Sequence, residues 1–453
     1  MYQRLSPRGT IGRRTAFAAG AVVAALGLAA CAGPSTAGAP AAEADEVIDW
    51  STIEPATEIT FWSNHPGMSQ QVEEELIAQF TEETGIAVDL VTAGADYDEV
   101  AQKFQSTSQS PDALPDVVIA SDVWWFRYQL NDQIMPLDDV LDAIDADAAD
   151  FQQSLYSDYE FDDRHWAVPY ARSTPLFYYN KDLWSAAGLP DRGPETWQEL
   201  EEWNADLAAV LPEDGSTLGL SVGPSWGAWW FENMIWGHGG AYSDGFTPTL
   251  DTPEAIEAGD WLGGIFAEDG MATVSQDSQA DFSAGIVAST IGSTGSLTGT
   301  LDAAAFEVGT AFLPDGEVEA GTPTGGTGLA IPSSRSPEQQ LAAAMFLEFL
   351  TNTDNTAYFS QNTGYMPVRT SAVESDTMKQ VYDEVPQMRT AVDQLAERAR
   401  VQDDVRVFVP GADAILSGAI EEIVLSGTDA QTAFEKITPQ LETAYAENVE
   451  PYL

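Results

Sequence analysis

Polar and apolar positions along the first ordered part of the chain predict strands that alternate with helices. Short runs rich in β-branched and aromatic residues predict strands, while Val72, Leu76, Ile77 and Phe80 recur at helical spacing. The predicted elements are strands at 58–63, 86–91 and 116–120, a helix that ends at Gly85, and a helix around 97–106. This β-α-β-α-β order predicts a mostly parallel sheet with right-handed crossovers.

The predicted sheet also indicates where a ligand would bind. In open parallel sheets, ligands bind outside the carboxyl ends of the strands. The loops after Trp62, Val91 and Ala120 are therefore expected to line a cleft.

The second half of the chain has a different pattern. Residues 173–180 predict a strand that enters a turn, and a serine followed by a proline at 336–337 predicts the start of a helix. The sequence has no Gly-rich phosphate loop, no zinc-type spacing of Cys and His, and no nucleophile elbow. We expect structural roles for His65, His165 and His238, and no catalytic residue, metal or cofactor.

Residues 1–30 have the pattern of a secretory signal peptide. Four arginines precede an apolar run of small residues at 17–30, which is too short to span a bilayer comfortably. Cys31, the only cysteine, follows at once, and residues 28–31 resemble the lipobox of bacterial lipoproteins. That resemblance implies cleavage before Cys31 and attachment of lipid to its thiol. The alternative is an ordinary signal peptide followed by an incidental cysteine.

The region after Cys31 is expected to be a tether. Residues 31–57 mix small residues, prolines and acids, a composition that cannot bury enough surface to fold alone. No later segment is long and apolar enough to cross a membrane, so the lipid is the only membrane attachment expected. The protein is therefore expected outside the cytoplasm, anchored to the cell membrane.

The charge of the chain limits its partners. A formal net charge of −54, from 72 acidic and 18 basic side chains, excludes nucleic-acid binding because no basic surface can neutralise phosphates. A solvated acidic surface accounts for most of this charge. With so many carboxylates, any pair of them is weak evidence for glycosidase chemistry. The roughly 400 residues beyond the tether are enough for two ordinary domains.

Four motifs resemble family 1 extracellular solute-binding proteins, the receptors of carbohydrate-type ABC importers. They occur in the order found in that family and lie at 173–183, 194–200, 324–331 and 363–368. The likeness covers roughly residues 58–450 and is closest to the glycerol-3-phosphate and glycerophosphodiester receptors.

The resemblance implies a fold and a function. The expected fold is α/β and two-lobed, of the type II periplasmic-binding-protein kind, with a mostly parallel sheet flanked by helices in each hinged lobe. One lobe is expected over 58–171 and 315–364, and the other over 172–314 and 365–453. The implied function is that of a monomeric, lipid-anchored receptor that delivers a sugar or glycerol-phosphate-type ligand to ABC permease subunits.

The resemblance also implies ligand-binding residues. Those at positions where the receptors contact ligand are Tyr97, Asp122, Ser173, Ser293, Gly325 and Tyr365, and the aromatics expected to flank the pocket are Trp197, Trp226 and Trp229. The resemblance also implies an arginine that grips phosphate near the C-terminus, but the matching stretch, 411–416, contains no arginine. Arg172 and Arg406 are the nearest candidates to replace it. The missing arginine favours a neutral sugar over a phosphorylated ligand.

Simpler structural roles exist for the same residues. Asp122 could cap a helix, Gly325 and Tyr365 could serve turns, Arg172 could form a salt bridge in the cleft, and Trp197 could belong to a helix start. Two other function classes also remain open: a secreted glycoside hydrolase that uses two carboxylates, and a surface scaffold without a small-molecule ligand.

Overall fold

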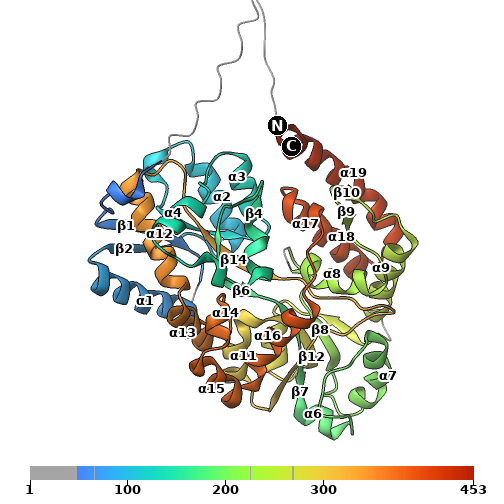
Figure 1. Ribbon diagram of the computed structural model, residues 1–453. Helices are drawn as coiled ribbons and strands as arrows, with labels where there is room; N and C mark the ends of the chain where they lie inside the picture. Colours follow the sequence, from blue (N-terminus) through green and yellow to red (C-terminus); the bar gives the residue numbers. More distant parts are fainter. Residues whose placement is uncertain (1–47, 66, 225, 268–269) are drawn as a thin grey trace, which may run out of the picture. The chain divides into compact units, whose positions relative to one another are not determined.

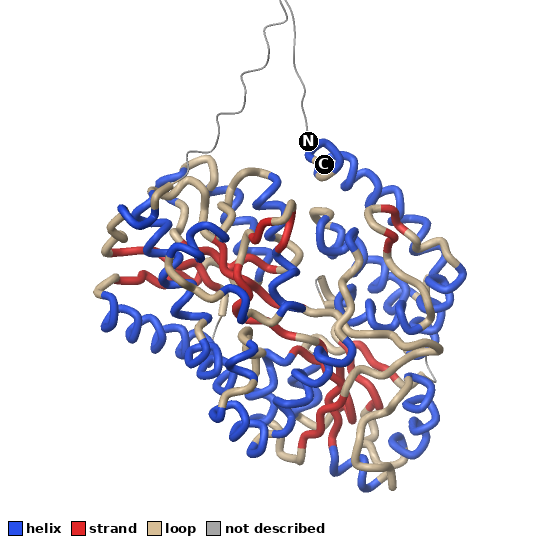
Figure 2. Tube along the Cα trace, in the orientation of Figure 1, coloured by secondary structure: helices blue, strands red, loops and turns tan. Residues whose placement is uncertain are grey.

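Two five-stranded sheets with helices around them organise the chain (Figures 1 and 2). The computed structural model describes residues 48–65, 67–224, 226–267 and 270–453. Cys31, the predicted signal peptide and most of the predicted tether lie outside these residues. Residues Asp49–Leu453 form one unit that contains both sheets, and the lobe boundaries given above stay predictions.

The first sheet has the strand order β2-β1-β3-β14-β6. Its strands are β1 (Glu58–Ser63), β2 (Ala87–Thr92), β3 (Val117–Ser121), β6 (Val168–Ser173) and β14 (Gly325–Ala330). β1 pairs in parallel with β2 and β3, whereas β14 is antiparallel to both of its neighbours. Four strands therefore point one way, and β14 is reversed between them.

The second sheet repeats this plan in the order β11-β8-β12-β7-β13. Its strands are β7 (Pro175–Asn180), β8 (Ser216–Leu220), β11 (Ala272–Val274), β12 (Val287–Ser293) and β13 (Val308–Ala311). Here β7 is the reversed strand, antiparallel to β12 and β13. The predicted α/β fold with mostly parallel sheets is confirmed, but the single reversed strand in each sheet was not predicted.

The strand predicted over 173–180 is wrong at its first two residues. Ser173 ends β6 of the first sheet, and β7 of the second sheet begins at Pro175, so Thr174 lies between the two sheets. Pro175 has no N–H to donate, and the first residue of a strand is a position that tolerates this loss.

Helices cover the first sheet through apolar faces read correctly from the sequence. Val72, Leu76 and Phe80 of α1 are buried, and the helix stops at Gly85 in the left-handed conformation. Phe346 of α12 packs against Phe61 of β1 with ring centroids 5.6 Å apart. The helices of this part are α1 (Met68–Thr84), α2 (Tyr97–Thr107), α3 (Trp125–Leu130), α4 (Asp138–Ala143), α5 (Gln153–Tyr156), α12 (Pro337–Thr351) and α13 (Thr353–Thr363).

The remaining helices include α8, whose eleven residues are all buried. They are α6 (Lys181–Ala186), α7 (Trp197–Ala208), α8 (Gly227–Gly237), α9 (Pro253–Ile265), α10 (Ser278–Ser283), α11 (Leu297–Ala303), α14 (Thr370–Val373), α15 (Asp376–Glu384), α16 (Pro386–Arg398), α17 (Asp404–Phe408), α18 (Ala412–Ser426) and α19 (Ala430–Asn448). Two short hairpins pair β4 (Glu160–Phe161) with β5 (Arg164–His165), and β9 (Ser243–Asp244) with β10 (Thr247–Pro248). Among the described helices, none has both the length and the apolar character needed to cross a bilayer.

The three histidines take part in local structure. His65 Nδ1 lies 2.6 Å from a buried carboxylate oxygen of Glu73, and His165 stacks on Tyr156. His238 contacts the main-chain carbonyl of Met234, four residues earlier. These contacts agree with the structural roles expected from the sequence.

Candidate functional site

A cavity of about 1360 Å³ opens at the strand ends of both sheets. In the first sheet, its lining comes from Asn64 after β1, 95–98 after β2, and 121–123 at the end of β3. Ser173 at the end of β6 and Gly325 at the start of the reversed β14 line it too. The loops predicted to line a cleft therefore do so, because the carboxyl ends of parallel strands meet at one edge of the sheet.

The second sheet contributes to the same cavity in the same way. Ser221 follows β8, Ser275 follows β11, and Ser293 ends β12, and all three line the cavity. Helices α10 and α11 add further polar side chains.

Nine of the eleven residues predicted to bind ligand line this cavity. They are Tyr97, Asp122, Ser173, Trp226, Trp229, Ser293, Gly325, Tyr365 and Arg406. Arg172 and Trp197 do not line it.

Arg172 lies in the protein interior beneath the site. Its side chain is fully buried, forms an ion pair with Asp158 and donates a 2.8 Å hydrogen bond to the Tyr159 hydroxyl. Burial lowers the pKa of Arg172, but the neighbouring Tyr159 and Asp158 raise it more, so the guanidinium stays charged. Asp158 in turn accepts a 2.7 Å hydrogen bond from Thr324 Oγ1, so Arg172 supports the cavity wall without lining it.

Trp197 is a packing residue at the start of α7. Only 2% of it is exposed, and its ring lies against Phe177 and Trp261. Its indole N–H donates to Asn233 Oδ1 at 3.2 Å, and the preceding Thr196 caps the helix.

Trp226 and Trp229 form an aromatic corner of the cavity. Trp229 donates its indole N–H to the Thr324 carbonyl at 2.8 Å and lies against Gly325, where a Cβ would come within 2.6 Å of the ring. Trp226 precedes α8 and is 40% exposed, with its ring centroid 5.8 Å from that of Trp229 at an interplanar angle of 68°. Trp229 is thus fixed in position, and Trp226 is open to solvent.

Two tyrosines form another part of the wall. Tyr97, the first residue of α2, and Tyr365, in the turn after α13, are hydrogen-bonded to each other through their side chains. Burial raises the pKa of both hydroxyls, so both remain neutral donors and acceptors at physiological pH. The Tyr365 ring lies against Gly295, where a Cβ would come within 2.7 Å of it.

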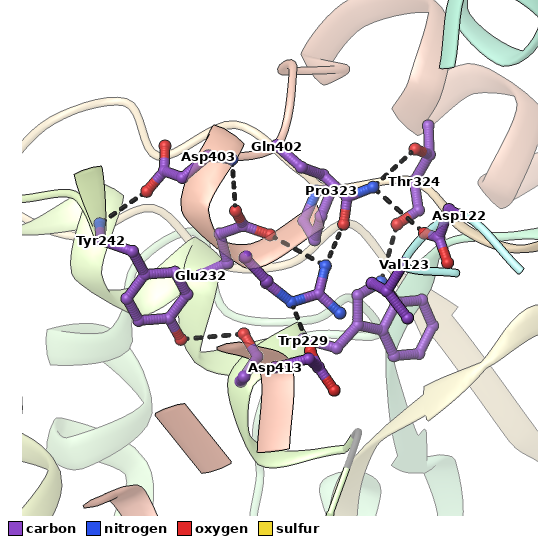
Figure 3. A network of polar contacts seen from close by, with 12 residues as sticks. Asp122, Val123, Trp229, Glu232, Tyr242, Pro323, Thr324, Gln402, Asp403 and Asp413 are labelled. Atoms are coloured by element: carbon purple, nitrogen blue, oxygen red, sulfur yellow. Dashed lines mark hydrogen bonds and ion pairs between the residues drawn. The ribbon is translucent and has the colours of Figure 1, made fainter. Parts of the chain in front are cut away.

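A polar network joins the Asp122 end of the cavity, through Gln402, to Arg406 on α17. Figure 3 shows this network from close by. Gln402 donates to Asp122 Oδ2 at 3.1 Å and accepts from Arg406 through its side-chain oxygen. Arg406 also contacts Asp413 at 2.8 Å through Nε and Glu232 at 3.5 Å through a terminal nitrogen.

The charges in this network compensate one another. Burial lowers the pKa of Arg406, but Asp413 and Glu232 raise it by more, so the guanidinium is charged. Burial raises the pKa of Glu232 well above its usual range, an effect that Arg406 only partly offsets. Arg406 is therefore held in place beside the cavity by its ion pair with Asp413 and by its contacts with Glu232 and Gln402.

The lining as a whole is acidic. It contains seven carboxylates, and Arg406 is the single arginine or lysine among the lining residues that the structure describes. A ligand with two negative charges would be repelled here, while a neutral, zwitterionic or cationic one would not.

Several residues of the site were not found from the sequence. Thr324 joins Asp158 through its hydroxyl and Trp229 through its carbonyl, and Gln402 bridges Asp122 and Arg406. Neither residue belongs to an element with a clear hydrophobic pattern, so only the folded contacts reveal them. The place of Thr324 in a resembling motif was the only available signal.

Comparisons with known proteins identify relatives of the chain. The sequence profile of a family described as bacterial extracellular solute-binding protein matches residues 75–388. A crystal structure of UgpB from Mycobacterium tuberculosis in complex with glycerophosphocholine is 44% identical, with a TM-score of 0.83. That match covers 87% of this chain and 100% of the other.

Two further comparisons are more limited. The sn-glycerol-3-phosphate-binding periplasmic protein UgpB of Salmonella typhimurium is 31% identical over 247 residues, which are 51% of this chain and 55% of that protein. The chain thus spans about half the length of the curated relatives it matches. Maltose-bound MalE3 of T. maritima has a TM-score of 0.75 at 21% identity, over 86% of this chain and 100% of the other, and supports the fold alone.

Proposed function

Because this chain belongs to the family of bacterial extracellular solute-binding proteins, we propose that it is the receptor of an ABC importer and that it captures a glycerophosphodiester. The observation that carries the choice of ligand is Arg406. It lines the cavity and pairs with Asp413, which belongs to the stretch 411–416 where the resemblance implies a phosphate-binding arginine. An arginine beside the same cavity, supplied from α17, supports a phosphate contact.

This proposal changes the preference drawn from the sequence. A neutral sugar was favoured because residues 411–416 contain no arginine. Arg406 supplies an arginine that lines the cavity, so the lack of an arginine within 411–416 no longer argues against a phosphate group. In addition, the relative with 44% identity was crystallised with glycerophosphocholine. The likeness extends over the full length of that relative, which favours a ligand of the same chemical class.

The charge of the cavity favours a phosphodiester over a phosphomonoester. A phosphodiester carries one negative charge, which Arg406 can match, whereas glycerol 3-phosphate carries nearly two at neutral pH. The seven lining carboxylates oppose the additional charge and attract a cationic head group such as choline. The faces of Trp226 and Trp229 are suited to a quaternary ammonium group.

Import would require that ligand binding favour a closed form of the receptor. Contacts made from both sheets at once stabilise the closed arrangement more than the open one, and this difference shifts the population. The proposed receptor is monomeric, is attached to the membrane through lipid on Cys31, and delivers its ligand to permease subunits. Catalytic turnover is not part of the proposal.

Isothermal titration calorimetry on the mature chain tests the proposal. Glycerophosphocholine should bind with a Kd near the micromolar range, about −8 kcal/mol, and unchanged ligand should be recovered. Glycerol 3-phosphate should bind at least about tenfold more weakly because of its extra charge. Binding of maltose without binding of glycerophosphocholine would instead support the second candidate, a neutral-sugar receptor, which the hydroxyl-rich side of the cavity favours.

A variant series separates a role of Arg406 from general damage. Arg406→Met should abolish glycerophosphocholine binding. Arg389→Met, which removes an exposed guanidinium paired with Asp393 outside the cavity, should bind like the parent protein. If Arg406→Met is folded by circular dichroism and binds glycerophosphocholine normally, the phosphate contact is refuted.

A further inference from the structure

One side of the cavity carries uncharged polar groups that the proposed phosphate contact does not use. This side, here called the hydroxyl wall, is formed by the residue after β11, by α10, and by the start of α11 with the residue before it. Its members are Ser275, Ser278, Gln279, Ser283, Ser296 and Thr298, all of which line the cavity. No arginine or lysine lines this part of the described cavity, so the hydroxyl wall cannot neutralise a phosphate.

Two hydroxyls of the wall lack hydrogen-bond partners among the residues that the structure describes. These are Ser275 Oγ and Thr298 Oγ1. Ser275 is only 4% exposed, so its hydroxyl is removed from bulk water. A buried hydroxyl without a partner is costly and is normally satisfied by another group. Other hydroxyls nearby are already satisfied, such as that of Thr300, which donates to the Ser296 carbonyl at 2.8 Å.

The strands below the wall leave space for these polar groups. Ser275 lies over Gly219 of β8, where a Cβ would come 3.0 Å from the serine oxygen. Gln279 lies over Gly292 of β12, where a Cβ would overlap the side-chain amide. Both glycines lie one residue before the cavity end of their strands, and β8 and β12 are adjacent in the sheet. Bare backbone at these two positions therefore leaves room for the Gln279 amide, and for the Ser275 hydroxyl together with the Val287 side chain.

The size of the cavity leaves room for a second group of the ligand. At about 1360 Å³ it is larger than the roughly 300–1,000 Å³ typical of pockets for drug-sized molecules. A small phosphodiester held by Arg406 would leave part of this space unfilled.

We propose that the hydroxyl wall is a second subsite, which binds an uncharged polyhydroxyl group joined to the same phosphodiester. This inference rests on the proposed function and names a wider ligand class, glycerophosphodiesters whose second alcohol is a polyol or a sugar. Hydroxyl groups suit the wall because each can donate to one partner and accept from another. The nearby carboxylates of Asp277 and Asp302 disfavour a second anionic group.

Calorimetric titrations with two ligands test the subsite. Both ligands carry the same glycerol and differ in the second alcohol of the phosphodiester. This alcohol is inositol, an uncharged polyol, in glycerophosphoinositol, and the cationic choline in glycerophosphocholine. The variants Ser275→Ala and Thr298→Val each remove one unpartnered hydroxyl, and Thr298 is only partly buried, so its replacement should be tolerated. The control is Thr443→Val, which removes a hydroxyl on α19, outside the cavity, that donates to the Pro439 carbonyl.

The expected result is selective. Each wall variant should weaken glycerophosphoinositol binding about threefold to tenfold, the effect of one neutral hydrogen bond. Glycerophosphocholine binding should be unchanged in these variants, and Thr443→Val should bind both ligands like the parent.

Other outcomes overturn the inference in distinguishable ways. If the parent binds both ligands but the wall variants lose affinity for neither, or for both equally, the subsite is refuted while the proposed function stands. If the parent binds neither ligand, the proposed function fails and the subsite falls with it. If Ser275→Ala does not fold, the Thr298→Val variant decides alone. A folded Thr298→Val variant that binds glycerophosphoinositol as tightly as the parent refutes the subsite.

Discussion

At the scale of single residues, the cavity depends on glycines that hold aromatic rings in place. Gly325 and Gly295 each leave space for a ring, that of Trp229 in one case and that of Tyr365 in the other. Neither glycine has a positive φ, so the requirement comes from close contact and not from backbone strain. A side chain at either position would have to displace an aromatic side chain that lines the cavity.

Replacement of Gly325 by alanine tests this dependence. The added Cβ would lie within 2.6 Å of the Trp229 indole and push it away from the Thr324 carbonyl. We expect a loss of about 1–3 kcal/mol in the free energy of unfolding, together with weaker glycerophosphocholine binding. Urea denaturation and calorimetry measure the two effects.

A matched glycine gives the opposite expectation. Gly418, within α18, has no atom within 4 Å of a built Cβ. Gly418→Ala should leave binding unchanged and increase the free energy of unfolding by about 0.5–1 kcal/mol. If Gly325→Ala and Gly418→Ala changed the free energy of unfolding and the ligand affinity equally, close contact with Trp229 would not be the reason for glycine at position 325.

Sequence reasoning found the residues of the site better than it found their roles. Tyr97, Asp122 and Tyr365 line the cavity, as predicted. They could be predicted because each follows a predicted strand or belongs to a resembling motif. Arg172 was predicted as a replacement for the missing phosphate-binding arginine, but it is buried against Asp158, an arrangement that depends on strand pairing that local sequence does not encode. Ligand contact by any of these residues is still a prediction.

At the scale of elements, helix starts and apolar faces were readable because their signals are local. The strand at Glu58–Ser63 was predicted with its observed bounds, and the next two are shifted by one residue. The reversed strands were not predictable in this way. β14 enters the first sheet more than 150 residues after β6, so its position depends on contacts between distant parts of the chain.

The start of α12 offers a test of a local signal. The Ser336 hydroxyl accepts a hydrogen bond from the Gln339 N–H, and the Gln339 side-chain oxygen accepts one from the Ser336 N–H. These two bonds form a capping box at the start of the helix. Ser336→Ala should lower the free energy of unfolding by about 0.5–2 kcal/mol. The exposed Ser106, which bonds only to the Lys103 carbonyl, serves as the control, and Ser106→Ala should have little effect in the same urea titrations. A similar loss in both variants would mean that the cap is not the cause.

At the scale of the whole molecule, the dominant feature is a net charge of −54. Several carboxyl groups are also buried, and burial raises the pKa of Glu232, Asp158, Asp403 and Asp116 above the usual values. Both features respond to pH in the same direction. Lower pH reduces repulsion between surface carboxylates, and it also supplies the protons that the buried groups bind more tightly in the folded protein.

The expected consequence is a melting temperature that rises as the pH falls from 8 toward about 5. A carboxyl whose folded pKa is raised adds stability below its unfolded pKa and loses it as pH increases through the folded pKa, so the unfolded chain binds fewer protons in this interval. Glu232→Gln, which keeps the shape of the side chain but cannot titrate, should make the melting temperature depend less on pH. Glu254→Gln at the exposed start of α9 should leave it as in the parent. Differential scanning calorimetry at constant ionic strength measures these profiles, and a melting temperature that falls over the same interval would mean that the buried carboxyl groups are held ionised.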